Sequence, residues 1–435
     1  MREVLRKSPD LRSHRPGALP GGVVTVCAFL TIVFGGDGAA QTVPSVAGSC
    51  PVREMSRQPL TVGPGQILYV EPMATSTAGA VTLLAGSPTF LWGTTASGQY
   101  RLEGRDTVFG ALITGAGTGR MIPSPIPASR IGLVRAVPTG NATWGVIFAE
   151  MTPEYHFPNR GTIAHLWFAT LSPRGWSPLT ELPATLNEAI NPSHSSELQY
   201  RHGNFAWAVR TDSSRTSSVA VFERNNGVWT YERLPVDDAA YVEFTGWTDN
   251  EMEIAIVRAF AEPGTHDSNS LFLHRRGEAW DTGRRIVRGG EEPVYEPAPL
   301  ETPRGKIITW WSRVGHGGGM SFPARTSLAR EGQPVVMLDS SVSQAFSLGL
   351  LPRREPVWVL NHRMPDSDGE LRIIRLVLGK PVVIARTPNP FKGPFSATVL
   401  DQSTIAVAGP LLSEDRGGSL STLVIRFRLR CDSAR

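Results

Sequence analysis

One pattern recurs along most of this chain: an alternating apolar strand, a turn that contains glycine, and a second strand. The segment "VFERNNGVWTYERLP" (221–235) contains all three parts, with a tryptophan after the turn at Asn225-Asn226-Gly227. Apolar alternation on both sides of such a turn is typical of a β-hairpin. Similar hairpins are predicted at residues 166–183, 270–287, 326–339 and 371–388. The turn glycines lie about 51 residues apart on average: Gly175, Gly227, Gly277, Gly332 and Gly379.

A second, more apolar strand occurs once in each period. Its cores are residues 89–93, 142–149, 205–209, 254–257, 307–311, 356–360 and 404–408, about 53 residues apart on average. No ten-residue helical pattern occurs after residue 40. A period near fifty that contains only strands predicts radially repeated sheets. We therefore expect an all-β fold, a seven-bladed β-propeller of four-stranded antiparallel blades.

The two ends of the chain predict how the ring closes. Three strands follow residue 395, so the last blade lacks its outer strand, and the N-terminal segment "CPVREMSRQPLTV" (50–62) can supply it. Cys50 opens this segment and Cys431 follows the third strand. We expect a Cys50–Cys431 disulfide across this seam, which stabilises the fold by about 4–5 kcal/mol on loop-closure entropy, less any native strain.

The first forty residues have the layout of a secretory signal peptide. A basic leader precedes the apolar run 23–34, and small residues follow at Gly38 and Ala40. Twelve apolar residues are too few to span a bilayer comfortably. We therefore expect residues 1–40 to be a signal peptide and residues 41–435 to be a single propeller domain without a membrane span. The expected location is outside the cytoplasm of a bacterium, either periplasmic or extracellular.

Charge and composition exclude some partners. The formal net charge of +4 includes the basic leader, and the rest of the chain is close to balanced. No polybasic stripe is present, so a nucleic-acid partner is not expected. We expect a monomer whose ligand or protein partner is unknown.

The turn-plus-tryptophan phrase resembles the Asp-box, the S-x-D-x-G-x-x-W signature of sialidase-like propellers. "RNNGVW" (224–229) and "SPRGWS" (172–177) keep the glycine and an aromatic residue but not the serine and aspartate. The resemblance implies the propeller fold only. Sialidases have six blades, a Tyr-Glu nucleophile pair, an acid/base aspartate and three arginines. Here seven cores occur, and no motif places the tyrosine or the aspartate.

Candidate ligand-binding residues gather in the loops that join the second to the third strand of each blade. These loops and the blade connections are expected on one face, around the central axis, where ligand sites are common. Arginine ends four consecutive second strands, and guanidinium groups bind carboxylate, sulfate or phosphate. The histidines are His156, His266, His316 and His362 of these loops and His194 of a connection between blades, and the arginines are Arg210, Arg258, Arg313 and Arg363.

Motifs for catalysis and for metal binding are missing. No G-x-S-x-G, H-x-H or H-E-x-x-H occurs, and "DSDGE" (366–370) lacks the rest of a calcium loop. We therefore expect no catalytic residue, no metal and no cofactor. Carboxylates on the candidate face, Glu150, Glu154, Asp212 and Asp267, leave a glycosidase pair open.

Three functions remain after these exclusions. The first is an exported propeller that binds an anionic or carbohydrate-like ligand, or a partner protein, on its loop face. The second is a glycoside hydrolase or lyase of sialidase-like descent. The third is a structural module of the cell envelope. The missing catalytic motifs favour binding.

Overall fold

The computed structural model describes residues 52–429 with gaps. The undescribed residues are 1–51, 61–65, 71–73, 77–78, 88–106, 114–117, 128–130, 141–142, 152–162, 173, 184–188, 213–215, 235, 261–267, 288–293, 314–323, 331–332, 341, 351–355, 363–368, 392–394, 401–402, 412–420 and 430–435. The chain divides into two compact units, Met1–Val46 and Ala47–Arg435, and all described residues belong to the second. The expected signal peptide, Cys50, Cys431 and the core at 89–93 lie outside the described residues.

The described residues form strands, turns and connections without an α-helix. They make antiparallel sheets, each written here from its inner to its outer strand. Sheet 1 contains β2 (Gln66–Val70), β4 (Gly79–Ser87), β5 (Thr107–Ile113) and β6 (Thr118–Pro127), with β3 (Ala74–Ser76) beside β4. Sheet 2 contains β7 (Ile131–Gly140), β8 (Thr143–Met151), β9 (Ile163–Ser172) and β10 (Gly175–Trp176), with β11 (Thr180–Glu181) beside β9. Sheet 3 contains β12 (Ala189–Ser195), β14 (Asn204–Asp212), β15 (Ser217–Asn225) and β16 (Val228–Leu234), with β13 (Gln199–Arg201) beside β14.

The remaining sheets have four strands each. Sheet 4 contains β17 (Ala239–Trp247), β18 (Met252–Phe260), β19 (Ser268–Arg276) and β20 (Arg284–Val287). Sheet 5 contains β21 (Val294–Leu300), β22 (Ile307–Arg313), β23 (Ala324–Arg330) and β24 (Val336–Asp339). Sheet 6 contains β25 (Val342–Leu350), β26 (Pro356–His362), β27 (Glu370–Val377) and β28 (Lys380–Pro388). Sheet 7 contains β29 (Ser396–Val399), β30 (Thr404–Leu411), β31 (Ser421–Leu429) and β1 (Val52–Leu60).

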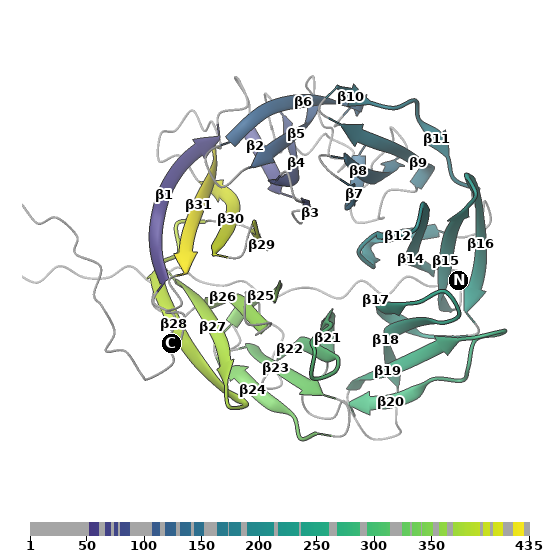
Figure 1. Ribbon diagram of the computed structural model, residues 1–435. Helices are drawn as coiled ribbons and strands as arrows, with labels where there is room; N and C mark the ends of the chain where they lie inside the picture. The colour runs from purple at the N-terminus through teal and green to yellow at the C-terminus, as the bar shows by residue number, and fades with distance from the viewer. Residues whose placement is uncertain are drawn as a thin grey trace, which may run out of the picture. The chain divides into compact units, whose positions relative to one another are not determined.

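Each sheet contacts the next along the chain, and sheet 7 contacts sheet 1 through β29 against β3 and β30 against β2. The inner strands lie nearest the centre and the outer strands at the rim (Figure 1). This radial order of antiparallel sheets is a β-propeller. The all-β propeller expected from the period near fifty is therefore confirmed.

The core lies between neighbouring sheets. One apolar cluster joins Phe168 of sheet 2 to Phe205 and Trp207 of sheet 3, and others join each following pair of sheets as far as sheet 7. The second strand β14 is buried almost throughout because sheets cover both its faces, whereas the outer strand β16 is mostly exposed. This explains why second strands have the most continuous apolar sequences.

The N-terminal strand completes the last sheet as predicted. β1 pairs antiparallel with β31, and Val52 lies opposite Leu429 and Arg53 opposite Arg428. Residues from the two ends of the described chain therefore share one sheet, and the contacts of sheet 7 with sheet 1 complete the circle of sheets.

The turn glycines follow the prediction in part. Gly175, Gly227 and Gly379 have positive φ values of 122°, 86° and 80°. These values are strained for residues with a Cβ atom. Gly277 is a correction: it is not among the described residues with positive φ, because β19 and β20 are joined by a longer connection in which Gly283 takes φ 82°. Gly332 lies outside the described residues.

The tryptophans after these turns pack between sheets, as predicted. Trp229 is buried against Phe168 of sheet 2, with ring centroids 5.4 Å apart. Trp176 lies 5.3 Å from Phe148 and packs against a cluster that includes Ile126 of sheet 1, and Trp280 packs against the cluster of sheets 3 and 4. These tryptophans therefore help to bind each sheet to the preceding one.

Candidate functional site

The candidate face, called the loop face here, is the end at which second strands connect to third strands. Several predicted residues belong to connections that the structure does not describe: His156, His266, His316 and Arg363. Arg313 ends β22, but only its backbone is described. The described side chains of the predicted set are those of His194, Arg210, Arg258 and His362.

Two of the predicted arginines contact groups within the protein. Arg210 donates from Nε to Asp212 Oδ1 at 2.7 Å and from Nη2 to Ser217 Oγ at 2.9 Å. Arg258 donates from Nε to the Asp237 carbonyl oxygen at 3.2 Å, and its Cζ lies 5.5 Å from the centroid of the Phe272 ring. Both arginines lie at the loop-face end of their second strands, as predicted, and both hold neighbouring residues in place.

His362 lies between two sheets. Its side chain is buried, and Nδ1 lies 2.9 Å from Oδ1 of Asp339, the last residue of β24 in sheet 5. The other carboxylate oxygen, Oδ2, accepts a hydrogen bond from Arg372 of β27 at 2.9 Å. The imidazole and the guanidinium of sheet 6 thus share one carboxylate of sheet 5, a contact that joins the two sheets.

His194 belongs to a group that we call the aromatic cluster: His194 of β12, Tyr241 of β17, Tyr295 of β21 and Trp311 of β22. The His194 and Tyr241 ring centroids are 4.6 Å apart, and those of Tyr241 and Tyr295 are 6.0 Å apart. Tyr295 stacks on Trp311 at 4.4 Å with an interplanar angle of 20°. The four side chains are half-buried, so an aromatic surface at the inner strands crosses three consecutive sheets.

The inner strands depart from regular pairing where they carry the cluster. The β12 ladder shifts register between Asn191 and Ser195, the β17 ladder between Ala239 and Tyr241, and the β21 ladder between Tyr295 and Ala298. Such bulges redirect side chains and are common beside binding sites. The cluster lies toward the loop face because Ala239 pairs with Arg258 and Tyr295 with Trp311, both near the ends of second strands.

Glu296 lies in the third of these bulges with an unusual backbone. Its φ is 44°, in the left-handed region that L-residues with a side chain seldom adopt. Its carboxylate accepts a hydrogen bond from Trp311 Nε1 at 3.0 Å. Desolvation by the surrounding protein raises the pKa of Glu296, and the Trp311 hydrogen bond opposes this only partly. The bulge therefore places a carboxyl group with a raised pKa beside the stacked rings.

A second carboxylate belongs to the inner strands. Glu243 of β17 accepts hydrogen bonds from the backbone N–H of Glu197 at 2.9 Å and of Phe244 at 3.1 Å. Burial and then the nearby Glu197 carboxylate raise the pKa of Glu243 well above its ordinary value. The sequence reasoning missed both Glu243 and Glu296 because neither belongs to a motif or to a long loop.

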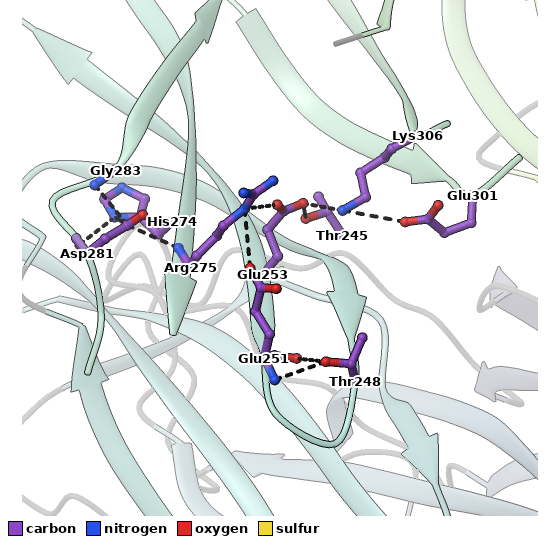
Figure 2. Close-up of polar contacts among 10 residues, drawn as sticks. All are labelled: Thr245, Thr248, Glu251, Glu253, His274, Arg275, Asp281, Gly283, Glu301 and Lys306. Atoms are coloured by element: carbon purple, nitrogen blue, oxygen red, sulfur yellow. Dashed lines mark hydrogen bonds and ion pairs between the residues drawn. The ribbon is translucent and has the colours of Figure 1, made fainter. Parts of the chain in front are cut away.

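The opposite end of sheet 4 contains a network around a buried carboxylate (Figure 2). Glu253 accepts hydrogen bonds from Thr245 Oγ1 at 2.6 Å, from Arg275 Nε at 2.6 Å and from the Lys306 ammonium group of the neighbouring sheet. Burial alone would raise the pKa of Glu253, but these three donors outweigh it and the pKa is lowered. The network therefore joins sheets 4 and 5.

His274 lies beside this network in Figure 2. It is buried, and Nδ1 lies 3.4 Å from the Asp281 carbonyl oxygen. Burial lowers the pKa of His274, although Asp281 opposes the shift, so the neutral ring is favoured. Among the described residues, no three His, Cys, Asp or Glu side chains are grouped as a metal ion would require, and no helix is long and apolar enough to cross a membrane.

Comparison with known proteins gives similarity of fold. No family model matches the chain, and no curated protein matches its sequence. A Dyadobacter fermentans protein of unknown function is similar in structure, with a TM-score of 0.48 and 9% identity over 88% of this chain and 100% of that one. Trypanosoma rangeli sialidase, solved with the inhibitor DANA, has a TM-score of 0.44 and 7% identity over 83% of this chain and 54% of the sialidase. Penicillium chrysogenum α-L-arabinanase, solved with arabinobiose, has a TM-score of 0.43 and 10% identity over 70% of this chain and 95% of the arabinanase.

Proposed function

We propose that this chain is a binding β-propeller whose ligand site is the aromatic cluster with Glu296, and that the ligand is carbohydrate-like. One observation supports the proposal most directly: four half-buried aromatic rings from three consecutive sheets lie together, with neighbouring ring centroids 4.4 to 6.0 Å apart. Half-buried rings with a few polar groups are the usual lining of a small-molecule site. A sugar ring fits this lining because its C–H face packs on aromatic rings while its hydroxyls bond to polar groups.

Glu296 is the polar group best placed to orient such a ligand. Its carboxylate accepts a hydrogen bond from Trp311 and lies beside the stacked Tyr295 and Trp311 rings. A left-handed backbone at a residue that is not glycine costs about 1–3 kcal/mol, and such residues gather at functional sites. Binding a hydroxyl group through Glu296 gives this costly conformation a purpose.

The arginines remain part of the proposal for an anionic ligand. Arg210 and Arg258 already contact Asp212 and the Asp237 carbonyl, so the described members support anion binding less than the rings support sugar binding. Whether Arg313, Arg363 and the remaining histidines also contact the ligand stays a prediction. The alternative ligand is a partner protein that binds to the loop face.

Ring closure and export are proposed together with ligand binding. We infer that sheets 1–7 are the blades of one ring, that a Cys50–Cys431 disulfide closes it, and that the protein is an exported monomer. The register of the described ladder supports the disulfide: Val52 pairs with Leu429, and Cys50 and Cys431 each lie two residues beyond this pair in the sequence.

The test is binding of defined sugars to the full chain and two variants, followed by saturation-transfer NMR. The probes are galactose and N-acetylglucosamine as neutral sugars and glucuronate as an anionic one. We expect Trp311→Ala to weaken binding about tenfold or more, because it removes the stacking surface. The control, Tyr231→Ala, removes a half-exposed ring from outer strand β16 and should leave affinity unchanged. Equal binding by the parent and Trp311→Ala, or no binding by any probe, would overturn the proposal.

A further inference from the structure

A hollow lies between sheets 3 and 4, at the end of the strands opposite the loop face. It holds about 240 Å³ and is lined by four turns, two from each sheet. The turns are Arg201–Asn204 and the one at Asn225 in sheet 3, and Trp247–Met252 and the one at Arg276-Gly277 in sheet 4. We call this hollow the turn-face groove. It is separate from the aromatic cluster because the two lie at opposite ends of the same strands.

Two arginines in its walls form ion pairs between the sheets. Arg201 of sheet 3 bonds through Nη2 to Asp249 Oδ2 at 2.9 Å and through Nη1 to the Trp247 carbonyl at 2.8 Å. Arg276 of sheet 4 bonds through Nη2 to Glu223 Oε2 at 2.9 Å and through Nη1 to Glu232 Oε2 at 3.1 Å. These bonds fix the positions of the charged walls, so the groove does not depend on a ligand to form.

The lining holds two arginines, Arg201 and Arg276, and three carboxylates, Glu223, Asp249 and Glu251. Arg201 pairs with Asp249 and Arg276 with Glu223, while Glu251 lies 3.4 Å from the guanidinium of Arg275, which is outside the lining. An anionic ligand would have to compete with carboxylates that the arginines already bind, and a cationic ligand would have to compete with the arginines. Because each charged group in the lining already has a partner of opposite sign, the groove favours a ligand held by hydrogen bonds rather than by net charge.

The other polar groups in the lining are uncharged amides that can donate and accept. Asn204, Asn225 and Asn250 line the groove, and each primary amide offers two N–H donors and one carbonyl acceptor. The exposed His202 imidazole lies at the same place, 3.6 Å from Asp249 Oδ1. Mixed donors and acceptors match hydroxyl groups, which also donate and accept. The volume is smaller than a drug-sized pocket and suits a single small ring.

We propose that the turn-face groove binds a neutral, polyhydroxylated molecule of about the size of one sugar ring. The ligand bridges sheets 3 and 4 through hydroxyl hydrogen bonds to the asparagine amides and the exposed oxygens of Asp249 and Glu251. No covalent step is involved. This site does not require the aromatic cluster to bind anything.

Gly277 allows the groove to be filled without breaking any contact. A Cβ atom built on Gly277 has no atom within 4 Å, and its φ is not in the left-handed region. Gly277 lines the groove, so Gly277→Tyr adds a ring at its wall, and Gly277→Ala is the matched control that adds only a methyl group at the same place. Equal melting temperatures of both variants and the parent show that they are folded.

The probes are glucose, mannose and myo-inositol as neutral polyols, with glucuronate and glucosamine as charged comparators. We expect a neutral polyol to bind the parent and Gly277→Ala alike and to bind Gly277→Tyr about tenfold or more weakly. In the Trp311→Ala background, which lacks the stacking surface of the aromatic cluster, Gly277→Tyr should still weaken polyol binding about tenfold and Gly277→Ala should not, which separates the groove from the cluster. The proposal is overturned if no neutral polyol binds at millimolar concentration, if Gly277→Tyr binds as well as the parent, or if only a charged comparator is sensitive to Gly277→Tyr.

Discussion

At the scale of single residues, Glu253 is the charge on which the contact of sheets 4 and 5 most depends. Its side chain is 6% exposed and has three donors around it. Glu253→Gln removes the negative charge and leaves Lys306 and Arg275 facing a neutral amide. We expect a loss of about 2–3 kcal/mol in the free energy of unfolding, because breaking a buried ion pair costs more than losing a surface pair. Chemical denaturation measures this.

Glu251→Gln is the matched control for that experiment. Glu251 lies 3.4 Å from the same Arg275, but both side chains are half-exposed, so its loss should change stability by about 0.5 kcal/mol or less.

The pKa of Glu253 is lowered in the folded state, so the contribution of Glu253 to stability is present above the ordinary glutamate pKa and is lost as pH falls below it. The stability difference between parent and Glu253→Gln should therefore shrink between about pH 4.5 and pH 2. A difference that stays constant with pH would contradict this account.

Gly283 occupies a position at which the structure requires glycine. Its φ is 82°, and a Cβ atom there would lie 2.3 Å from the His274 ring. Gly283→Ala should therefore destabilise the protein by about 2 kcal/mol, from backbone strain together with displacement of a buried ring. Gly277→Ala, in the same connection but with open space, should be close to neutral. Thermal unfolding compares the two, and equal melting temperatures would show that Gly283 is replaceable.

At the scale of elements, β1 and β31 connect the two ends of the described chain. If the ladder from Val52 and Leu429 continues to residues 50 and 431, oxidised protein has a Cys50–Cys431 disulfide that peptide mass spectrometry detects. Cys50→Ser should then lower the free energy of unfolding by about 5 kcal/mol under oxidising conditions and have no effect under reducing ones. Free thiols at both positions in oxidised protein would refute the disulfide.

The strands were easier to predict from the sequence than the candidate site. The cores at 205–209, 254–257, 307–311, 356–360 and 404–408 all lie within second strands, because sheets cover both their faces and only continuous apolar sequence fits there. In sheet 1 the second strand is β4, Gly79–Ser87, ahead of the core expected at 89–93, and the structure does not describe that core.

The site depends on features that a periodic pattern does not contain. Tyr295 and Trp311 face each other because of pairing across β21 and β22, and Glu296 is turned by a bulge that no glycine marks. The sequence predicts His362 in a loop, but it is the last residue of β26, and its partner Asp339 is twenty-three residues away in the neighbouring sheet. Pairing within a sheet decides the first two positions and a contact between sheets decides the third, whereas sequence spacing predicts only the end of the strand near which a residue lies.

At the scale of the whole molecule, the two ends of the propeller differ. The loop face has the aromatic cluster on three inner strands and β22, and the opposite face has the turn-face groove between sheets 3 and 4. Strands hold the residues of the aromatic cluster in place, and ion pairs hold the walls of the turn-face groove. The sheets themselves are joined by apolar clusters and by the Glu253 and Asp339 networks.

The central claim is that the aromatic cluster is a carbohydrate-like ligand site. Its most direct test is a crystal structure of the full chain soaked with galactose, N-acetylglucosamine and glucuronate. We expect electron density for a sugar ring packed on Tyr295 and Trp311, with a hydroxyl group within hydrogen-bond distance of Glu296. Density for the sugars elsewhere on the molecule, with the Tyr295 and Trp311 rings uncovered, would contradict it.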